Sequence, residues 1–175
     1  MAVVMAHRSA VPFLPPTVAP AKRQGWDTAA WIACLWFGCG RVPIAPGTAG
    51  TLGALPLYLL LRPLGAAWVA MAALVVTVIG VVASSRVARI VGQKDPQFIC
   101  IDEVAGVLLT WVAAPANWKG TVLGFVLFRL FDMTKPFPAR RCERLSGGLG
   151  IVLDDIAAGV WGAAVLVALR SFGWI

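Results

Sequence analysis

The sequence predicts an all-α protein, a polytopic bundle of membrane helices with about four to five spans. Three observations support this fold class. The chain is 59% hydrophobic and its mean hydropathy is +0.83. Only 13% of its residues are charged, against about 25% in typical soluble domains. Apolar stretches close to bilayer length alternate with short loops that carry most of the basic residues, and 175 residues suffice for one such domain.

The N-terminal part differs in character from the rest. Residues 1–25 are basic and rich in proline, which predicts a flexible cytoplasmic tail ahead of a membrane-embedded domain over residues 26–175. The apolar runs of this tail are too short and interrupted for a typical signal peptide. Residues 29–39 are apolar but number only about a dozen, which favours a short interfacial or re-entrant helix over a span.

Five further apolar stretches follow in order. Several are shorter than the roughly 20 residues that a perpendicular span requires, so we expect charged residues at their ends to lie at head-group depth. The first of the five ends at Arg62 and Pro63. The stretches are Thr51–Leu61, Ala66–Ala83, Phe98–Ala114, Thr121–Met133 and Gly150–Leu169.

The basic residues predict the topology. They gather in the tail and in the loops 84–97 and 135–149, whereas the intervening connections carry only Arg62 and Lys119. The positive-inside rule places the basic loops in the cytoplasm, so the chain starts inside, crosses about five times and ends outside. The net charge of +7 is then explained by topology and by contact with anionic lipid, and no nucleic-acid partner is expected.

Five of the eight acidic residues lie at the ends of apolar stretches, and the predicted topology brings them to the cytoplasmic face. Ionisable groups beside membrane spans are rare unless they have a function. The alternative interpretation is that these acids lie at helix N-termini, where the helix dipole favours negative charge. This interpretation is weaker where two acids are adjacent in the sequence. Carboxylate oxygens suit one or two Mg²⁺ ions. The five residues are Asp102, Glu103, Asp132, Asp154 and Asp155.

Basic and small residues accompany these acids. Arg129 and Asp132 are three residues apart, so they share a helix face, and Lys135 follows three residues later. The alternative is an ordinary ion pair at the end of a helix. Gly159 and Gly162 share a face with Asp155 and favour close approach of a second helix there.

A glycine-rich run, PGTAGTLG, occupies residues 46–53. Such a run entering a helix can direct backbone N–H groups at a phosphate, although the Gly-Lys-Ser/Thr ending of a Walker loop is absent. A stripe of small residues for helix packing is the alternative. The candidate phosphate contacts here are Arg41, Gly47, Thr48, Gly50 and Thr51.

Other phosphatase chemistries find no support in the sequence. The only histidine is His7, in the tail, which argues against a phosphohistidine intermediate or a histidine base. No cysteine is followed by five residues and an arginine, as a cysteine phosphatase would require. The four cysteines also lack metal-finger spacing, so we interpret them as reduced thiols.

Taken together, these stretches resemble the phosphatidylglycerophosphatase A family of bacterial inner-membrane lipid phosphatases. The resemblance covers four regions, in the family's order, between about residue 37 and residue 164. The matching stretches are FGCGRVPIAPGTAGTLGALP, IDEVAG, GFVLFRLFDMTKPFPARR and GGLGIVLDDIAAGVWGA.

The resemblance implies Mg²⁺-dependent hydrolysis of phosphatidylglycerophosphate to phosphatidylglycerol and phosphate in the bacterial inner membrane. The predicted topology places this reaction at the cytoplasmic face. It implies that the five acids above are the catalytic and metal-binding residues. It also implies that Arg129, Lys135 and the Gly47–Thr51 loop contact the substrate. We expect water to attack the phosphomonoester with Asp155 or Glu103 as base, while an aspartyl-phosphate route stays open.

Three other classes of protein fit the sequence less well. A lipid alcohol phosphotransferase would carry a D-G-x-x-A-R pattern, which the chain lacks. An ion channel or transporter would place its acids near the midplane and show internal repeats. A structural membrane subunit would leave the converging carboxylates unexplained. The sequence does not determine the number of metal ions or the selectivity against phosphatidic acid. It does not determine the oligomeric state either, and it is compatible with a homo-oligomer.

Overall fold

The computed structural model describes residues 25–175, and over this range it contains helices and no strand. The prediction of an all-α fold is therefore confirmed for the described part of the chain. The predicted tail over residues 1–25 lies outside this part, except for Gly25, which is the first residue of the first helix.

Eight α-helices and two short 3₁₀ helices form the described structure. In chain order they are α1 (Gly25–Cys34), η1 (Trp36–Arg41), α2 (Pro46–Gly53), α3 (Leu55–Leu61), η2 (Arg62–Leu64), α4 (Ala66–Val91), α5 (Ile101–Val112), α6 (Trp118–Thr134), α7 (Ala139–Cys142) and α8 (Gly148–Ser171).

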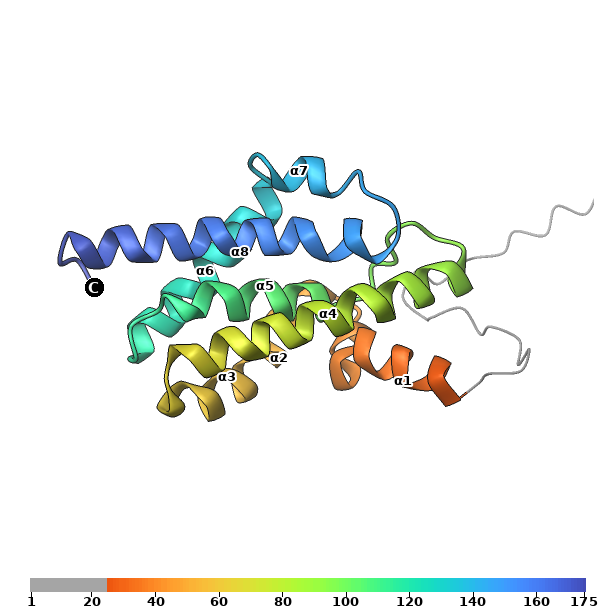
Figure 1. Ribbon diagram of the computed structural model, residues 1–175, viewed down its shortest axis with the longest axis horizontal. Coiled ribbons are helices and arrows are strands. Elements are labelled where there is room, and N and C mark those ends of the chain that lie inside the picture. Colours follow the sequence, from red (N-terminus) through yellow and green to blue (C-terminus); the bar gives the residue numbers. More distant parts are fainter. Residues whose placement is uncertain (1–24) are drawn as a thin grey trace, which may run out of the picture.

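The short helix α5 forms the centre of the bundle. Figure 1 shows α5 between the two long helices α4 and α8, which run in opposite directions, with α1 to α3 on one side and α7 on the other. Helix α5 packs against α4, α8, α6 and α2. Its Val104, Val107 and Leu108 side chains are completely buried, so this helix supplies much of the core.

Two described helices, α4 with 26 residues and α8 with 24, are long and apolar enough to cross a membrane. Helix α5 has 12 residues and is therefore only about 18 Å long, shorter than a bilayer core. Helix α6 has 17 residues, and the predicted segment Thr51–Leu61 is divided between α2 and α3. The prediction of four to five spans is thus not confirmed.

Helices α5 and α8 cross closely where glycines face each other. The hydroxyl of Thr110 lies 3.1 Å from the Gly106 carbonyl oxygen and 3.2 Å from that of Gly159. A Cβ atom added at Gly162 would lie 2.8 Å from Cγ2 of Thr110. The predicted small-residue face of α8 is therefore confirmed as its packing surface on α5, and it orients α8.

The ends of the helices bring separate segments to one end of the bundle. Helix α6 ends at Lys135, whose left-handed conformation (φ 44°) directs the chain away before Pro136. Helix α8 begins after Gly147 (φ 66°), and the amide of Gly148 donates to the Ser85 hydroxyl of α4 at 2.8 Å. The end of α6 and the starts of α5 and α8 consequently surround a common space.

Candidate active site

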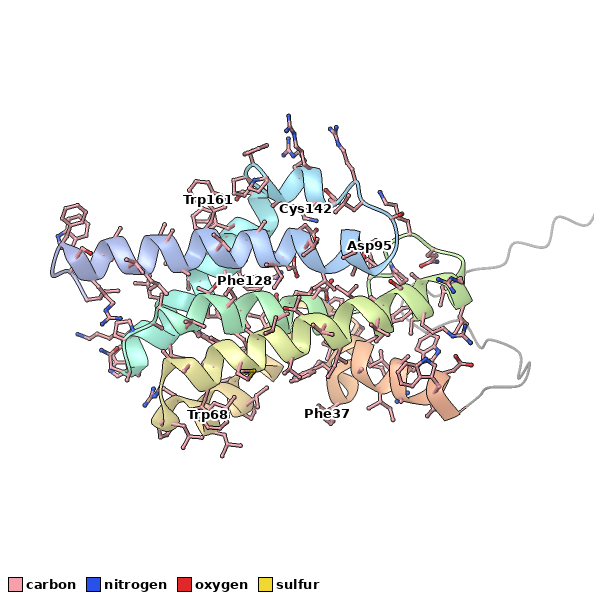
Figure 2. The ribbon with its side chains drawn as sticks, viewed as in Figure 1. Phe37, Trp68, Asp95, Phe128, Cys142 and Trp161 are labelled. Carbon is pink, nitrogen blue, oxygen red and sulfur yellow. The ribbon has the colours of Figure 1, made fainter. Side chains whose placement is uncertain are left out.

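A cavity of about 410 Å³ lies at this end of the bundle. It receives residues from α2, from the loop before α5, and from α5, α6 and α8. Figure 2 shows Asp95, one of the lining residues, near the beginning of α8. The lining residues are Ala45, Pro46, Gly47, Asp95, Gln97, Ile99, Asp102, Glu103, Arg129, Asp132, Lys135, Ile151, Asp154 and Asp155.

All five predicted acids line this acidic cavity. One carboxylate oxygen each from Asp102, Glu103 and Asp155 lie within 4.8 Å of one another. The first two residues belong to the first turn of α5, where the helix dipole favours negative charge. Two sequence-distant helices therefore present three carboxylates to one point.

The acids of α8 lie inside that helix and not at its start. Helix α8 begins at Gly148, so Asp154 and Asp155 follow its first turn. Only 5% and 4% of their surfaces are exposed. These two residues therefore do not cap α8, and the helix N-terminal interpretation of this pair is wrong.

Two cations bind carboxylates within the cavity. Arg129 Nη1 lies 2.6 Å from Asp132 Oδ2, which confirms that these residues share a face of α6. Lys135 Nζ lies 2.7 Å from Asp154 Oδ2 and 3.4 Å from Glu143 Oε1. Burial alone would lower the pKa of Lys135, but the hydrogen bond and charge of Asp154 raise it above its ordinary value.

Several carboxylate oxygens in the cavity lack a hydrogen-bond partner. Among the described residues, Asp102 Oδ1, Glu103 Oε2 and Asp154 Oδ1 are buried without one. The cavity holds six carboxylates, including Asp95, against the two cations Arg129 and Lys135. Because buried carboxylates require compensation, this donor set fits a hard, oxygen-binding divalent cation such as Mg²⁺.

The first glycine of the glycine-rich run lies against the cavity. A Cβ atom at Gly47 would collide with Glu103 Oε1 and lie 3.2 Å from Arg129 Nη1. Any larger residue at this position would therefore displace the Glu103 carboxylate and crowd the Arg129 guanidinium. The absence of a side chain lets the start of α2 approach the carboxylate and the guanidinium.

The other predicted phosphate contacts do not line the cavity. Gly50 packs on Cys100, where an added Cβ atom would lie 2.7 Å from the Cys100 Cβ. The buried hydroxyl of Thr51 donates to the Gly47 carbonyl at 2.8 Å. Thr48 is half-buried and Arg41 is exposed. A substrate role for these four residues stays a prediction.

Asp95 is a cavity residue that the sequence reasoning missed. It lies in the loop between α4 and α5, and burial raises the pKa of its carboxyl group, an effect that the nearby Lys135 charge opposes. In the sequence it precedes Pro96 and resembles an ordinary turn residue. The sequence feature that could have identified Asp95 as a site residue is its position on the predicted cytoplasmic side, shortly before Asp102.

Comparisons with known proteins identify the family of this chain. The profile of the family described as phosphatidylglycerophosphatase A matches residues 32–170. The chain belongs to the phosphatidylglycerophosphatase A family. Membership makes it a hydrolase of the phosphatase class, and the resemblance inferred from the four motifs is confirmed.

Individual relatives cover most of the chain. A phosphatidylglycerophosphatase A from Escherichia coli is 40% identical over 132 residues, which are 74% of this chain and 77% of the relative. A phosphatidylglycerophosphatase A from Haemophilus influenzae is 34% identical over 86% of this chain and 94% of its own length. A Bacteroides thetaiotaomicron relative, whose name suggests a phosphatidylinositol-3-phosphatase, is 37% identical over 77% and 89%. No solved structure matches the chain.

Proposed function

We propose that the protein hydrolyses the terminal phosphomonoester of phosphatidylglycerophosphate, which yields phosphatidylglycerol and inorganic phosphate. The observation that carries this proposal is the acidic cavity, in which Arg129 and Lys135 accompany six carboxylates in a chain of this family. Such a site provides cations for phosphate oxygens and carboxylates for a metal ion and for proton transfer.

The names of the relatives support a lipid phosphomonoester as substrate. Two of them are named for phosphatidylglycerophosphate and one for phosphatidylinositol 3-phosphate. Both lipids carry a terminal phosphomonoester together with an internal phosphodiester in the same head group. We favour phosphatidylglycerophosphate because the matching family profile and two relatives carry its name.

We propose that Asp102, Glu103 and Asp155 hold one Mg²⁺ ion, and that Asp132 and Asp154 contribute to a second ion if two bind. The proximity of three carboxylate oxygens and the unpartnered Oδ1 of Asp102 and Oε2 of Glu103 support this assignment. When bound, the ion neutralises negative charge on the carboxylates and on the substrate phosphate.

Several side chains of the cavity have a second role in this reaction besides holding the metal ions. Arg129 and Lys135 bind the phosphate oxygens, and their partners Asp132 and Asp154 hold them in position. Asp155 or Glu103 accepts a proton from water as the water oxygen bonds to phosphorus. The bond from phosphorus to the glycerol oxygen breaks, and that oxygen takes up a proton from solvent.

We propose that the bundle is embedded in a bacterial inner membrane with the acidic cavity at the cytoplasmic face. Helix α4 exposes a continuous apolar surface that would be unfavourable in water, including Trp68, Met71, Leu74 and Val78. Among the described residues, most of the basic ones lie in the segments 84–97 and 135–149 at the cavity end of the bundle, which the positive-inside rule assigns to the cytoplasm. An alkaline phosphatase fused after Ile175 is then expected to be active outside the cytoplasm.

The test is phosphate release from phosphatidylglycerophosphate by the purified full-length protein in neutral detergent, with Mg²⁺ and with EDTA. We expect release that requires Mg²⁺ and that is lost in Asp132→Asn. The matched control is Glu143→Gln, because Glu143 also faces Lys135 but is exposed and lies outside the acidic cavity lining.

Absence of release by folded wild-type protein would contradict the proposed substrate. Release that is unchanged in EDTA would contradict the metal assignment alone. A folded Asp132→Asn protein with normal turnover would remove Asp132 from the site. Thermal unfolding in the same detergent establishes that each variant is folded.

A further inference from the structure

We propose that a second, basic pocket beside the acidic cavity binds the internal phosphodiester of the lipid whose terminal phosphomonoester is hydrolysed. This inference rests on the proposed function and adds a determinant of substrate selectivity to it. The basic pocket has a volume of about 490 Å³ and is lined by Thr134, Lys135, Pro136, Phe137, Arg140, Arg141 and Arg144.

The two pockets meet at Lys135, which lines both of them. The left-handed conformation of this residue ends α6 and turns the chain from the acidic cavity into the basic pocket. In phosphatidylglycerophosphate one glycerol unit joins the two phosphate groups. A head group with its phosphomonoester at Lys135 in the acidic cavity would therefore carry its phosphodiester towards the neighbouring pocket.

The arginines of the basic pocket are available for an anion. Arg140, Arg141 and Arg144 are exposed, and none of them forms an ion pair with any residue that the structure describes. In contrast, Arg129 and Lys135 are already paired with carboxylates. Guanidinium groups bind phosphate oxygens well, so three unpaired arginines form an anion site without a protein counter-ion.

Contacts with α8 hold the pocket in place. The indole nitrogen of Trp161 donates to the Phe137 carbonyl oxygen at 2.9 Å, and Figure 2 shows Trp161 on the α7 side of α8. The guanidinium carbon of Arg141 lies 4.9 Å from the centre of the Phe137 ring. The hydrogen bond from Trp161 thus connects the pocket to α8, the helix that carries Asp154 of the acidic cavity.

General attraction of surface arginines to anionic lipid is the competing explanation. It predicts the same loss for any basic residue at the cytoplasmic end of the bundle. Arg89, in the last turn of α4, is exposed and lines neither pocket. Arg89→Gln is therefore the matched control for a change of surface charge.

The test compares Arg140→Gln, Arg141→Gln and Arg144→Gln with Arg89→Gln in uncharged detergent micelles. We expect KM for phosphatidylglycerophosphate to rise about tenfold in at least one single pocket variant and further in the triple variant, with kcat within about twofold. Phosphatidylglycerol, which keeps only the phosphodiester, is expected to inhibit the variants about tenfold less strongly. Inhibition by inorganic phosphate, which lacks the diester, is expected to stay unchanged.

Equal inhibition constants for phosphatidylglycerol in wild type and the triple variant would overturn the proposal. A parallel loss of inhibition by inorganic phosphate, or an equal effect in Arg89→Gln, would also overturn it. If the wild type releases no phosphate, the proposed function fails separately. Binding of short-chain phosphatidylglycerol to wild type and triple variant then decides the inference, because it needs no turnover.

Discussion

The acidic cavity and the basic pocket share Lys135 but are built in different ways. The acidic cavity collects residues from five separate parts of the chain, and its α8 acids are almost completely buried. The basic pocket comes from one continuous segment, residues 134–144, and its arginines are exposed. The acidic cavity therefore depends on the packing of the whole bundle, whereas the residues of the basic pocket come from one short segment.

The cost of burying charge explains this difference. Exposed guanidinium groups stay hydrated, so one turn next to α8 can present them at little cost. Buried carboxylates lose hydration and must be compensated by cations, hydrogen bonds or a metal ion. We therefore expect changes in the acidic cavity to affect turnover, and changes in the basic pocket to affect substrate affinity.

The largest effect is expected from Asp155→Asn. The substitution removes one of the three converging carboxylates with little change of shape, so the proposed metal binding and the proposed proton transfer would both be impaired. We expect kcat to fall at least about a thousandfold, measured as phosphate release at saturating Mg²⁺. Turnover within tenfold of wild type would exclude Asp155 from both roles.

Two of the three glycines of α2, Gly47 and Gly50, allow the next test. Gly47→Ala forces a Cβ atom onto Glu103, so we expect kcat/KM to fall about tenfold to a hundredfold with little change in thermal stability. Gly50→Ala forces a Cβ atom onto Cys100 outside the cavity lining, so we expect loss of about 1–3 kcal/mol of stability instead. The reverse pattern would show that the acidic cavity does not extend to Gly47.

A smaller effect is expected from Asp95→Asn. Asp95 lines the acidic cavity but is not among the three converging carboxylates. We expect the Mg²⁺ concentration for half-maximal activity to rise severalfold while kcat at saturating Mg²⁺ falls less than about tenfold. A titration of activity with Mg²⁺ measures both quantities, and an unchanged titration curve would contradict a role for Asp95 in the site.

The smallest effect is expected from Glu143→Gln. Its carboxylate is exposed and lies 3.4 Å from Lys135, which keeps its shorter contact with Asp154. Exposed ion pairs contribute about 0–1 kcal/mol, so we expect kcat/KM to change less than about fivefold. A loss as large as that of Asp155→Asn would place Glu143 in the catalytic machinery.

Much of the site could be predicted because its acids stand out against an apolar background. Asp102, Glu103, Asp132, Asp154 and Asp155 were all predicted from their positions beside apolar stretches, and all five line the acidic cavity. Asp95 could not be predicted in this way. It lies in a polar loop, where an acidic residue is ordinary, and only its place in the cavity lining beside residues of α6 and α8 makes it unusual.

The span count was the least predictable part of the fold. Apolar content identified α8 to within two residues at each end and the start of α4, although α4 continues to Val91, beyond the predicted end at Ala83. It could not distinguish the buried α5 from a helix that crosses a bilayer. A helix enclosed by protein on several sides and a helix enclosed by lipid are both apolar. Helix α5 begins after Cys100 and ends before Ala113, and composition does not reveal these boundaries.

The sequence by itself determined the helical class, the family and the five acids, because apolar length, isolated charge and motif order are local properties of the chain. Only the tertiary structure decided that Asp154 and Asp155 lie inside α8 and that Gly47 faces the cavity while Gly50 faces Cys100. The physical reason is that the residues that pack against one face of a helix come from segments far away in the sequence. The crossing of α5 and α8 at Gly106 and Gly159 sets which side chains meet, and no local pattern encodes that geometry.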